Sequence, residues 1–281
     1  MIGWKRLMTL STVLLAVAIL AAVPTIAGNS AGTSAPHKTA GPRPHAMATT
    51  WTIAALGDSV TAGTHCDCTA FPTLYANELS ASRGVAGTAL NLGVGGETSG
   101  ELLAQLRNSR SKEFAAVKNA DIDLLTIGAN DFADNYDEIT QGECAGPDAT
   151  DCVRDQIAEM RHNIVAALAQ IRELRNGKPT AMLVTGYWSV FEDGDVATAA
   201  FPSTGLKATQ VLTTKVNRAI DDAARAAGAT YVDLFASFNG AAAHGDVTSL
   251  LAPDGDHPNA RGQALIANRL LAAGLRGLTA G

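Results

Sequence analysis

Short apolar runs alternate with longer amphipathic stretches throughout the chain after Trp51. The apolar runs are aliphatic and β-branched, which predicts buried strands at 52–56, 88–92, 122–127, 180–187 and 230–235. The stretches between them have apolar residues at helical spacing, which predicts helices at 72–82, 153–175 and 206–227. A further helix is expected to contain Leu102, Leu103 and Leu106, and the last helix is expected to follow Gly262. Strands that alternate with helices form a parallel sheet covered on both faces. We therefore expect a three-layer α/β/α fold on a doubly wound, five-stranded parallel sheet.

Residues 1–27 have the layout of a secretory signal peptide. A basic region at Lys5 and Arg6 precedes an apolar stretch over 7–23, and small residues follow up to Ala27. We expect cleavage near Ala27 and a secreted, extracellular protein without stable membrane insertion. An uncleaved anchor is the alternative, because the apolar stretch approaches the ~18–20 residues that span a bilayer.

The rest of the chain divides into a linker and one domain. Residues 28–50 are rich in Ala, Gly, Ser, Thr and Pro, which predicts a flexible linker. Residues 51–281 are long enough for a large core, and the chain is 47% hydrophobic and 17% charged, as in a globular protein. Without residues 1–27 the chain has 19 basic groups against 27 acidic ones. That acidic excess argues against a nucleic-acid partner.

The chain has four cysteines, an even number that in an exported protein suggests two disulfides rather than a metal site. Cys144 and Cys152 are the favoured pair, because the loop between them is short, polar and rich in turn residues. Cys66 and Cys68 would then pair with each other. A bond across one residue is unfavourable for the usual Cα separation, so crossed pairing with Cys144 and Cys152 stays open.

The first predicted strand ends at Gly57-Asp58-Ser59. Gly57 permits a tight turn, which would deliver Ser59 to the carboxyl end of the strand, where open α/β sheets have their ligand sites. Ser59 is therefore a candidate nucleophile. The simpler interpretation is that Asp58 or Ser59 only caps a following helix, because both residue types are favoured caps.

Two further loops follow strands at the same edge of the sheet. The loop 93–100 begins like a dinucleotide-binding fingerprint, but Thr98 stands where the third glycine is expected, which argues against a cofactor of that kind. Its glycines instead allow a backbone N–H to approach a ligand closely. Asn130 follows the third strand and lies at the same edge as Ser59, although asparagine is also an ordinary turn residue.

A turn-rich segment before the last helix contains Asp254, Asp256 and His257. His257 is a candidate general base for Ser59, and Asp254, three residues earlier, is a candidate for fixing its tautomer. Asp256 is adjacent to His257, so its side chain is expected to diverge and to have a minor role. A metal site is the weaker interpretation of these three residues, because no further ligand cluster is evident.

These separated segments, taken in order, resemble the blocks of the SGNH, or GDSL-type, hydrolase family. Gly57-Asp58-Ser59 is similar to the first block, and Asn91-Leu-Gly-Val-Gly-Gly-Glu-Thr98 to the second. Gly128-Ala-Asn-Asp131 is similar to the third, and Asp254-Gly-Asp-His257 to the fifth. The resemblance covers nearly everything from Trp51 onward and implies a flavodoxin-like fold.

The resemblance also implies a mechanism. Ser59 would attack an ester carbonyl, His257 would accept its proton, and Asp254 would hold the imidazolium that forms. The oxyanion would be bound by the N–H groups of Ser59 and Gly96 and by the amide of Asn130. Gly95 stays open as an alternative to Gly96. No cofactor or metal is required.

The catalytic blocks do not define the substrate, which the resemblance leaves as a small-molecule, lipid or polysaccharide ester. We expect a lipase-like or short-chain carboxylesterase that acts as a monomer. Deacetylation of a carbohydrate is the alternative activity. A secreted binding protein without catalysis on the same scaffold is a further alternative, since a fold does not fix a function.

Overall fold

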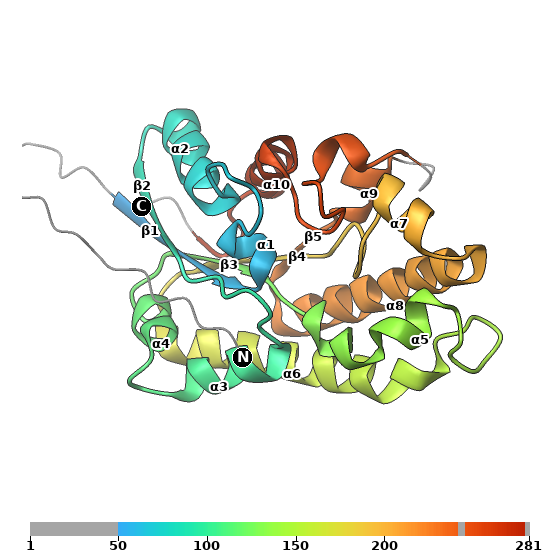
Figure 1. Cartoon of the computed structure of the whole chain (residues 1–281). Helices are drawn as coiled ribbons and strands as arrows, with labels where there is room; N and C mark the ends of the chain where they lie inside the picture. The colour runs from blue at the N-terminus through green and yellow to red at the C-terminus, as the bar shows by residue number, and fades with distance from the viewer. Residues whose placement is uncertain (1–49, 241–244, 279–281) are drawn as a thin grey trace, which may run out of the picture. The chain divides into compact units, whose positions relative to one another are not determined.

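The sheet in the computed structural model contains five parallel strands and confirms the expected fold class (Figure 1). The structure describes residues 50–240 and 245–278. The strands are β1 (Thr50–Gly57), β2 (Ala86–Asn91), β3 (Ile122–Thr126), β4 (Ala181–Thr185) and β5 (Thr230–Val232). They lie side by side in the order β2-β1-β3-β4-β5, and every neighbouring pair is parallel. This order is flavodoxin-like, and its switch point lies between β1 and β3.

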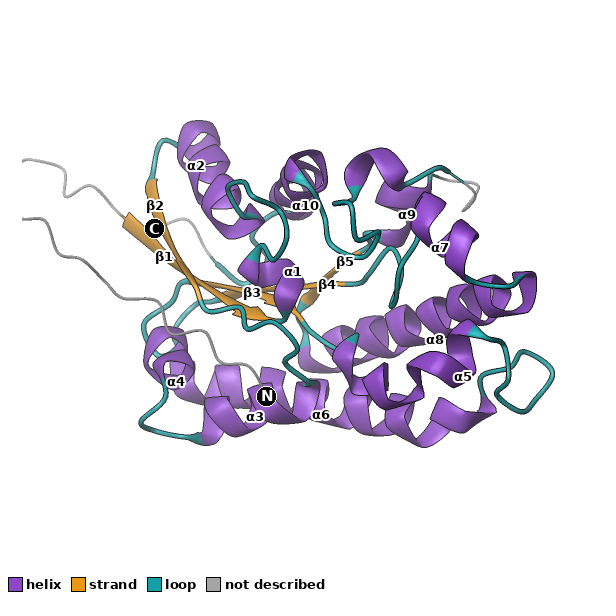
Figure 2. Cartoon of the chain, in the orientation of Figure 1, coloured by secondary structure: helices purple, strands orange, loops and turns teal. Residues whose placement is uncertain are grey.

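Helices cover both faces of the sheet (Figure 2). One face carries α2 (Phe71–Arg83) and α10 (Ala260–Ala273), and the other carries α3 (Ser99–Arg107), α4 (Lys112–Val117), α6 (Arg154–Arg175) and α8 (Ser203–Ala227). The remaining helices are shorter: α1 (Ser59–Ala62), α5 (Tyr136–Thr140), α7 (Gly194–Ala200) and α9 (Phe235–Asn239). Single 3₁₀ segments span Asn130–Asn135, Asp151–Val153 and Thr248–Leu250.

The core follows from this layering. Every residue of β3 and β4 is buried, as expected for central strands packed against helices on both faces. The apolar stripe predicted for 153–175 faces the core, where Met160, Ile164, Leu168 and Ile171 are buried in α6. No helix in the described ranges combines the length and the apolar character needed to cross a bilayer.

Several predicted boundaries need correction. Strand β1 begins at Thr50, inside the range assigned to the linker, because Thr50 already pairs with Ala86. Strand β4 ends at Thr185 rather than at 187, because Asn217 of α8 binds the backbone N–H and carbonyl of Tyr187 at 2.8 Å each. Strand β5 ends at Val232, and α9 begins at Phe235. The predicted signal peptide and residues 28–49 of the predicted linker lie outside the described residues.

Candidate active site

Ser59 lies at the turn between β1 and α1, as the sequence predicts. Gly57 has a φ of +125°, and a Cβ there would overlap the carbonyl oxygen of Thr126, so only glycine fits. The next residue, Asp58, donates its N–H to the same Thr126 carbonyl at 3.0 Å, which joins this turn to β3. Ser59 is the first residue of α1 and is half-buried. The serine is therefore presented at the carboxyl edge of the sheet, at the switch point between β1 and β3.

Asp58 caps α1, and it also has a second role that the sequence did not indicate. Its carboxylate accepts a hydrogen bond from the N–H of Val60 at 3.0 Å and another from the hydroxyl of Tyr187. Burial raises the pKa of Asp58 to about 7, although both hydrogen bonds act in the opposite direction. At neutral pH the carboxyl next to the candidate nucleophile is therefore protonated to a much larger extent than an ordinary aspartate.

The glycine loop after β2 is tied to the nucleophile turn. Asn91 donates its side-chain N–H to the carbonyl of Thr61 at 2.8 Å, and Val94 donates its backbone N–H to the carbonyl of Gly57 at 2.8 Å. Gly96 lies farther along this loop, is exposed, and has a φ of +80°, which favours glycine. Gly95 does not have a positive φ. The backbone of Gly96 therefore depends on glycine more than that of Gly95 does.

Asn130 contacts the backbone of Glu97, the residue that follows Gly96. Its side-chain amide donates a hydrogen bond to the backbone carbonyl of Glu97 at 3.0 Å. The side chain of Glu97 is buried, and this burial, together with repulsion from Glu113, raises its pKa to about 7. The structure thus brings the predicted second and third loops together at the edge where Ser59 lies.

Asp254 holds the backbone and the ring of His257. Its Oδ1 accepts hydrogen bonds at 3.0 Å from the backbone N–H groups of Asp256 and His257. Its Oδ2 lies 2.8 Å from Nδ1 of His257. Burial opposes ionisation of Asp254, but these hydrogen bonds from the backbone and from the ring together hold its pKa below the ordinary value. Oδ2 of Asp256 is farther from the same ring nitrogen, at 3.6 Å.

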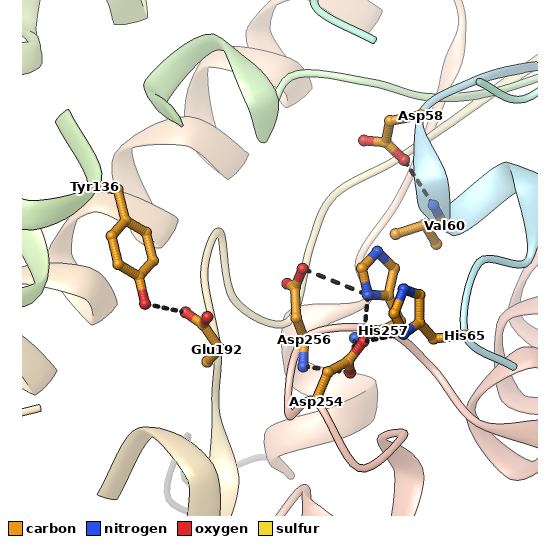
Figure 3. Close-up of polar contacts among 8 residues, drawn as sticks. All are labelled: Asp58, Val60, His65, Tyr136, Glu192, Asp254, Asp256 and His257. Carbon is orange, nitrogen blue, oxygen red and sulfur yellow. Dashed lines mark hydrogen bonds and ion pairs between the residues drawn. The ribbon is translucent and has the colours of Figure 1, made fainter. Parts of the chain in front are cut away.

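Helix α10, which begins three residues after His257, is hydrogen-bonded to α1 next to Ser59. The fully buried Gln263 accepts a hydrogen bond from the N–H of Phe71 at 2.7 Å and donates one to the carbonyl of Val60 at 3.3 Å. The charge of His257 lowers the pKa of Asp58, the residue before Ser59, so the ring lies within electrostatic reach of this turn; both residues are drawn in Figure 3. In the described part of the chain no hydrogen bond joins the Ser59 hydroxyl to His257. Such loose geometry is common before a substrate binds.

A second histidine lies at this site and was missed by the sequence analysis. His65 stacks on His257 with ring centroids 5.1 Å apart and an angle of 12° between the ring planes. Its Nδ1 is 3.2 Å from Oδ2 of Asp254. No periodicity or spacing indicates this contact, because it depends on the path of the loop that follows α1.

A small pocket of about 250 Å³ opens beside Asn130 and Asp256. Its walls combine the apolar and aromatic side chains of Ala129, Ala133, Tyr136, Val190 and Phe191 with the polar groups of Asn130, Glu192 and Asp256. Tyr136 packs edge-to-face on Phe191 with ring centroids 5.0 Å apart, and its hydroxyl donates a hydrogen bond to Glu192 at 2.9 Å. The Tyr136–Glu192 pair is visible in Figure 3, across from Asp256.

The four cysteines form two close pairs. Cys144 lies next to Cys152 with Cα atoms 5.4 Å apart, as favoured from the sequence. Cys66 lies next to Cys68 with Cα atoms 5.0 Å apart, so the structure gives the local pairing rather than the crossed one. Over residues 50–240 and 245–278, no group of three His, Cys, Asp or Glu side chains is arranged to hold a metal ion.

Comparison with known proteins gives one family and several similar folds. The model of the GDSL-like lipase/acylhydrolase family matches residues 55–265. A lipase, Lip_vut3, from a goat rumen metagenome is similar in structure, with a TM-score of 0.63 and 20% identity over 82% of this chain and 100% of the lipase. No curated protein matches the chain in sequence.

Two other solved structures share the fold. Axe2, an acetylxylan esterase from Geobacillus stearothermophilus, has a TM-score of 0.56 and 17% identity over 82% of this chain and 97% of its own. LAE5, an alpha/beta hydrolase from the metagenome of Lake Arreo in Spain, has a TM-score of 0.55 and 19% identity over 83% of this chain and 98% of its own. At these identities the likeness extends to the fold alone.

Proposed function

The chain belongs to the GDSL-like lipase/acylhydrolase family, and from this membership we propose that it is a serine esterase with Ser59 as the nucleophile. One observation carries the proposal. Asp254 Oδ2, 2.8 Å from His257 Nδ1, fixes a ring whose charge acts on Asp58, the residue before Ser59. That contact leaves the other ring nitrogen, Nε2, available as a base.

The proposed reaction begins with attack on the ester carbonyl. His257 takes the proton of the Ser59 hydroxyl as the new C–O bond forms, and Asp254 stabilises the resulting imidazolium. The carbonyl oxygen becomes an oxyanion, which the N–H groups of Ser59 and Gly96 and the amide of Asn130 stabilise. His257 then protonates the leaving alcohol. Water, deprotonated by the same histidine, releases the acid and restores Ser59.

The raised pKa values of two carboxyl groups fit an oxyanion at this place. Asp58 and Glu97 adjoin Ser59 and Gly96 in sequence, and burial raises both pKa values to about 7. A neutral carboxyl does not repel a negative charge that develops nearby, whereas a carboxylate would. The larger neutral fraction of both groups therefore supports the proposed stabilisation of the oxyanion.

We propose a small acyl group as the substrate's acid part. The pocket beside Asn130 is about 250 Å³ in volume, below the ~300–1,000 Å³ of pockets for drug-sized ligands. Its mixed apolar and polar walls suit a short acyl group better than a long hydrocarbon chain. This favours a short-chain carboxylesterase over an enzyme for long-chain lipids. An acetylated carbohydrate is the second candidate substrate, since an acetyl group fits the same pocket and Axe2, with a similar fold, is an acetylxylan esterase.

The test is hydrolysis of p-nitrophenyl esters from acetyl to palmitoyl, with Ser59→Ala as the control. We expect activity highest for the short acyl groups and lost in the variant, while its melting temperature stays at that of the wild type. Undiminished activity in Ser59→Ala would reject Ser59 as the nucleophile. Release of acetate from acetylated xylan, with no hydrolysis of aryl esters, would favour the carbohydrate substrate.

We also propose that the protein is exported, which rests on the signal-like pattern of residues 1–27. Amino-terminal sequencing of the protein from culture medium would show a start near Gly28. Recovery only in the membrane fraction, with Met1 retained, would instead support the uncleaved anchor.

A further inference from the structure

One carboxylate oxygen at the candidate site faces two imidazole rings. Oδ2 of Asp254 lies 2.8 Å from Nδ1 of His257 and 3.2 Å from Nδ1 of His65. The two rings are stacked almost in parallel, with centroids 5.1 Å apart. Figure 3 shows His65 on the side of His257 that lies away from Asp256. A Ser-His-Asp mechanism uses only one of these two imidazoles, so His65 requires an explanation of its own.

The backbone of His65 has an uncommon conformation. His65 has a φ of +56° and Asp67 a φ of +47°, in the left-handed region that non-glycine residues adopt only uncommonly. Such positions persist where the surroundings hold them, and they cluster at functional sites. Here the loop is held by the pairing of Cys66 with Cys68 and by a hydrogen bond from the N–H of Cys66 to the carbonyl of Gly63 at 3.3 Å.

Burial does not explain why the side chain of His65 lies against Asp254 and His257. The side chain of His65 is 61% exposed, against 14% for His257. An exposed side chain gains little from the hydrophobic effect, so its contacts with Asp254 and His257 are what distinguish it from any other loop residue. By contrast, His162 on α6 is also exposed and has no such contact with either residue.

We propose that His65 is a positioning residue of the active site, which acts through Asp254. Oδ1 of Asp254 is already fixed by two backbone N–H groups. The His65 imidazole places a second nitrogen beside Oδ2, which limits rotation of the carboxylate away from His257. Its ring also covers one face of the His257 ring. The inference rests on the proposed function, because it requires His257 to act as the base.

We expect the loss of the His65 side chain to lower turnover rather than to weaken substrate binding. His65 does not line the pocket beside Asn130, so we expect its loss to leave the Michaelis constant nearly unchanged. A loosened Asp254 stabilises the imidazolium less well, and the imidazolium exists only after proton transfer. We expect a loss in kcat on the order of tenfold, smaller than the ~100-fold that a 1 Å misplacement can cost.

Two substitutions of His65 distinguish the contribution of its ring nitrogen from the contribution of its ring stacked on His257. His65→Asn keeps an N–H near the place of Nδ1, and asparagine tolerates the left-handed backbone. His65→Phe keeps a ring against His257 but has no nitrogen. We expect His65→Asn to keep kcat within about twofold of the wild type and His65→Phe to lose it on the order of tenfold. The same two substitutions at His162 serve as matched controls and should leave kcat unchanged.

A measurement without substrate distinguishes failure of this inference from failure of the proposed function. Long-range ¹H–¹⁵N spectra report which ring nitrogen of each histidine carries the proton, and the His257→Gln variant assigns the signals of His257. We expect His65→Phe to shift the nitrogen signals of His257 and His162→Phe to leave them in place. Thermal melts of all variants identify any that fail to fold, in which case His65→Asn supplies the comparison.

The outcomes are distinct. Wild-type kcat in His65→Phe, with unchanged His257 signals, overturns the positioning role while the esterase stands. Shifted His257 signals in a protein that hydrolyses no ester refute the proposed function but support the His65–Asp254–His257 contact. Equal losses of kcat in the His65 and His162 variants also overturn the inference, because they would show that any exposed histidine has this effect.

Discussion

The hydroxyl of Tyr187, just beyond β4, donates a hydrogen bond to the buried carboxylate of Asp58, the residue before the candidate nucleophile. These two residues are 129 positions apart in sequence. The carboxylate also caps α1 through the N–H of Val60. Asp58 thus connects the end of the sheet with the helix on which Ser59 is presented, and its ionisation bears on the stability of that turn.

The buried Asp58 should make folding stability depend on pH. Its folded pKa is raised to about 7, whereas an aspartate in an unfolded chain titrates near ~3.9. Between these values the folded state binds more protons than the unfolded state, so the stabilisation is complete below ~pH 4 and is lost as the pH rises through about 7. Asp58→Asn keeps the oxygen that caps α1 and has no proton to lose.

Urea unfolding at pH 4.5 and at pH 8.5 checks this prediction. We expect the wild type to lose roughly 2–4 kcal/mol more of its free energy of unfolding across this range than Asp58→Asn does. The exposed Asp195→Asn in α7 is the control and should follow the wild type. An identical pH dependence in wild type and Asp58→Asn would show that Asp58 is ionised alike in both states.

Asn130→Ala should reduce turnover more than affinity. The amide would donate to an oxyanion that exists only in the transition state, and removing one such donor typically costs ~10²- to 10³-fold in kcat. Because the amide also holds the carbonyl of Glu97 at 3.0 Å, a smaller rise in the Michaelis constant is expected too. Steady-state kinetics on p-nitrophenyl acetate measure both. The exposed Asn119→Ala, at the end of α4, is the control, and an unchanged kcat in Asn130→Ala would remove Asn130 from the oxyanion hole.

Asp254 and Asp256 should differ sharply when each is replaced by asparagine. Asp254 lies 2.8 Å from Nδ1 of His257, and Asp256 lies 3.6 Å away. Asp254→Asn removes the charge that would stabilise the imidazolium, so a loss approaching ~10⁴-fold in kcat is expected, as known for Ser-His-Asp triads. Asp256→Asn should cost far less. The reverse ranking would transfer the orienting role to Asp256.

Tyr136→Ala should shift the preference toward longer acyl chains. The ring of Tyr136 forms a wall of the pocket beside Asn130, and its removal lengthens the space available to an acyl chain. Each additional buried CH₂ is worth ~0.8 kcal/mol, or about fourfold in kcat/KM. Tyr136→Phe keeps the ring and removes only the hydrogen bond to Glu192, so its chain-length profile should match the wild type. An unchanged profile in Tyr136→Ala would place the acyl group elsewhere.

The strands and the loops that follow them were predictable because their signals are local. β1 and β3 are short apolar runs, and Ser59 and Asn130 come directly after them or within a few residues, so parallel pairing alone brings both to one edge. Asp254 and His257 are three residues apart, a spacing at which a turn lets the two side chains meet. The short helices α7 and α9 were missed, since segments of seven and five residues carry too few apolar positions to show a period.

The contacts of Asp58 and His65 could not be predicted in this way. The Asp58–Tyr187 hydrogen bond depends on the point where β4 leaves the sheet, which Asn217 of α8 determines. The His65 contact depends on a left-handed loop closed by the Cys66–Cys68 pair. Both arise from tertiary structure and have no counterpart in periodicity or spacing.

The hydrogen bond from Gln263 to Val60 joins residues 203 positions apart. A ribosome therefore makes the candidate nucleophile early and the candidate base only after most of the domain has been synthesised. Until α10 docks beside α2 and its Gln263 binds Val60, the segment that contains His257 is not held beside the turn of Ser59. The proposed proton transfer from Ser59 to His257 would thus become possible only once the last helix of the domain is in place.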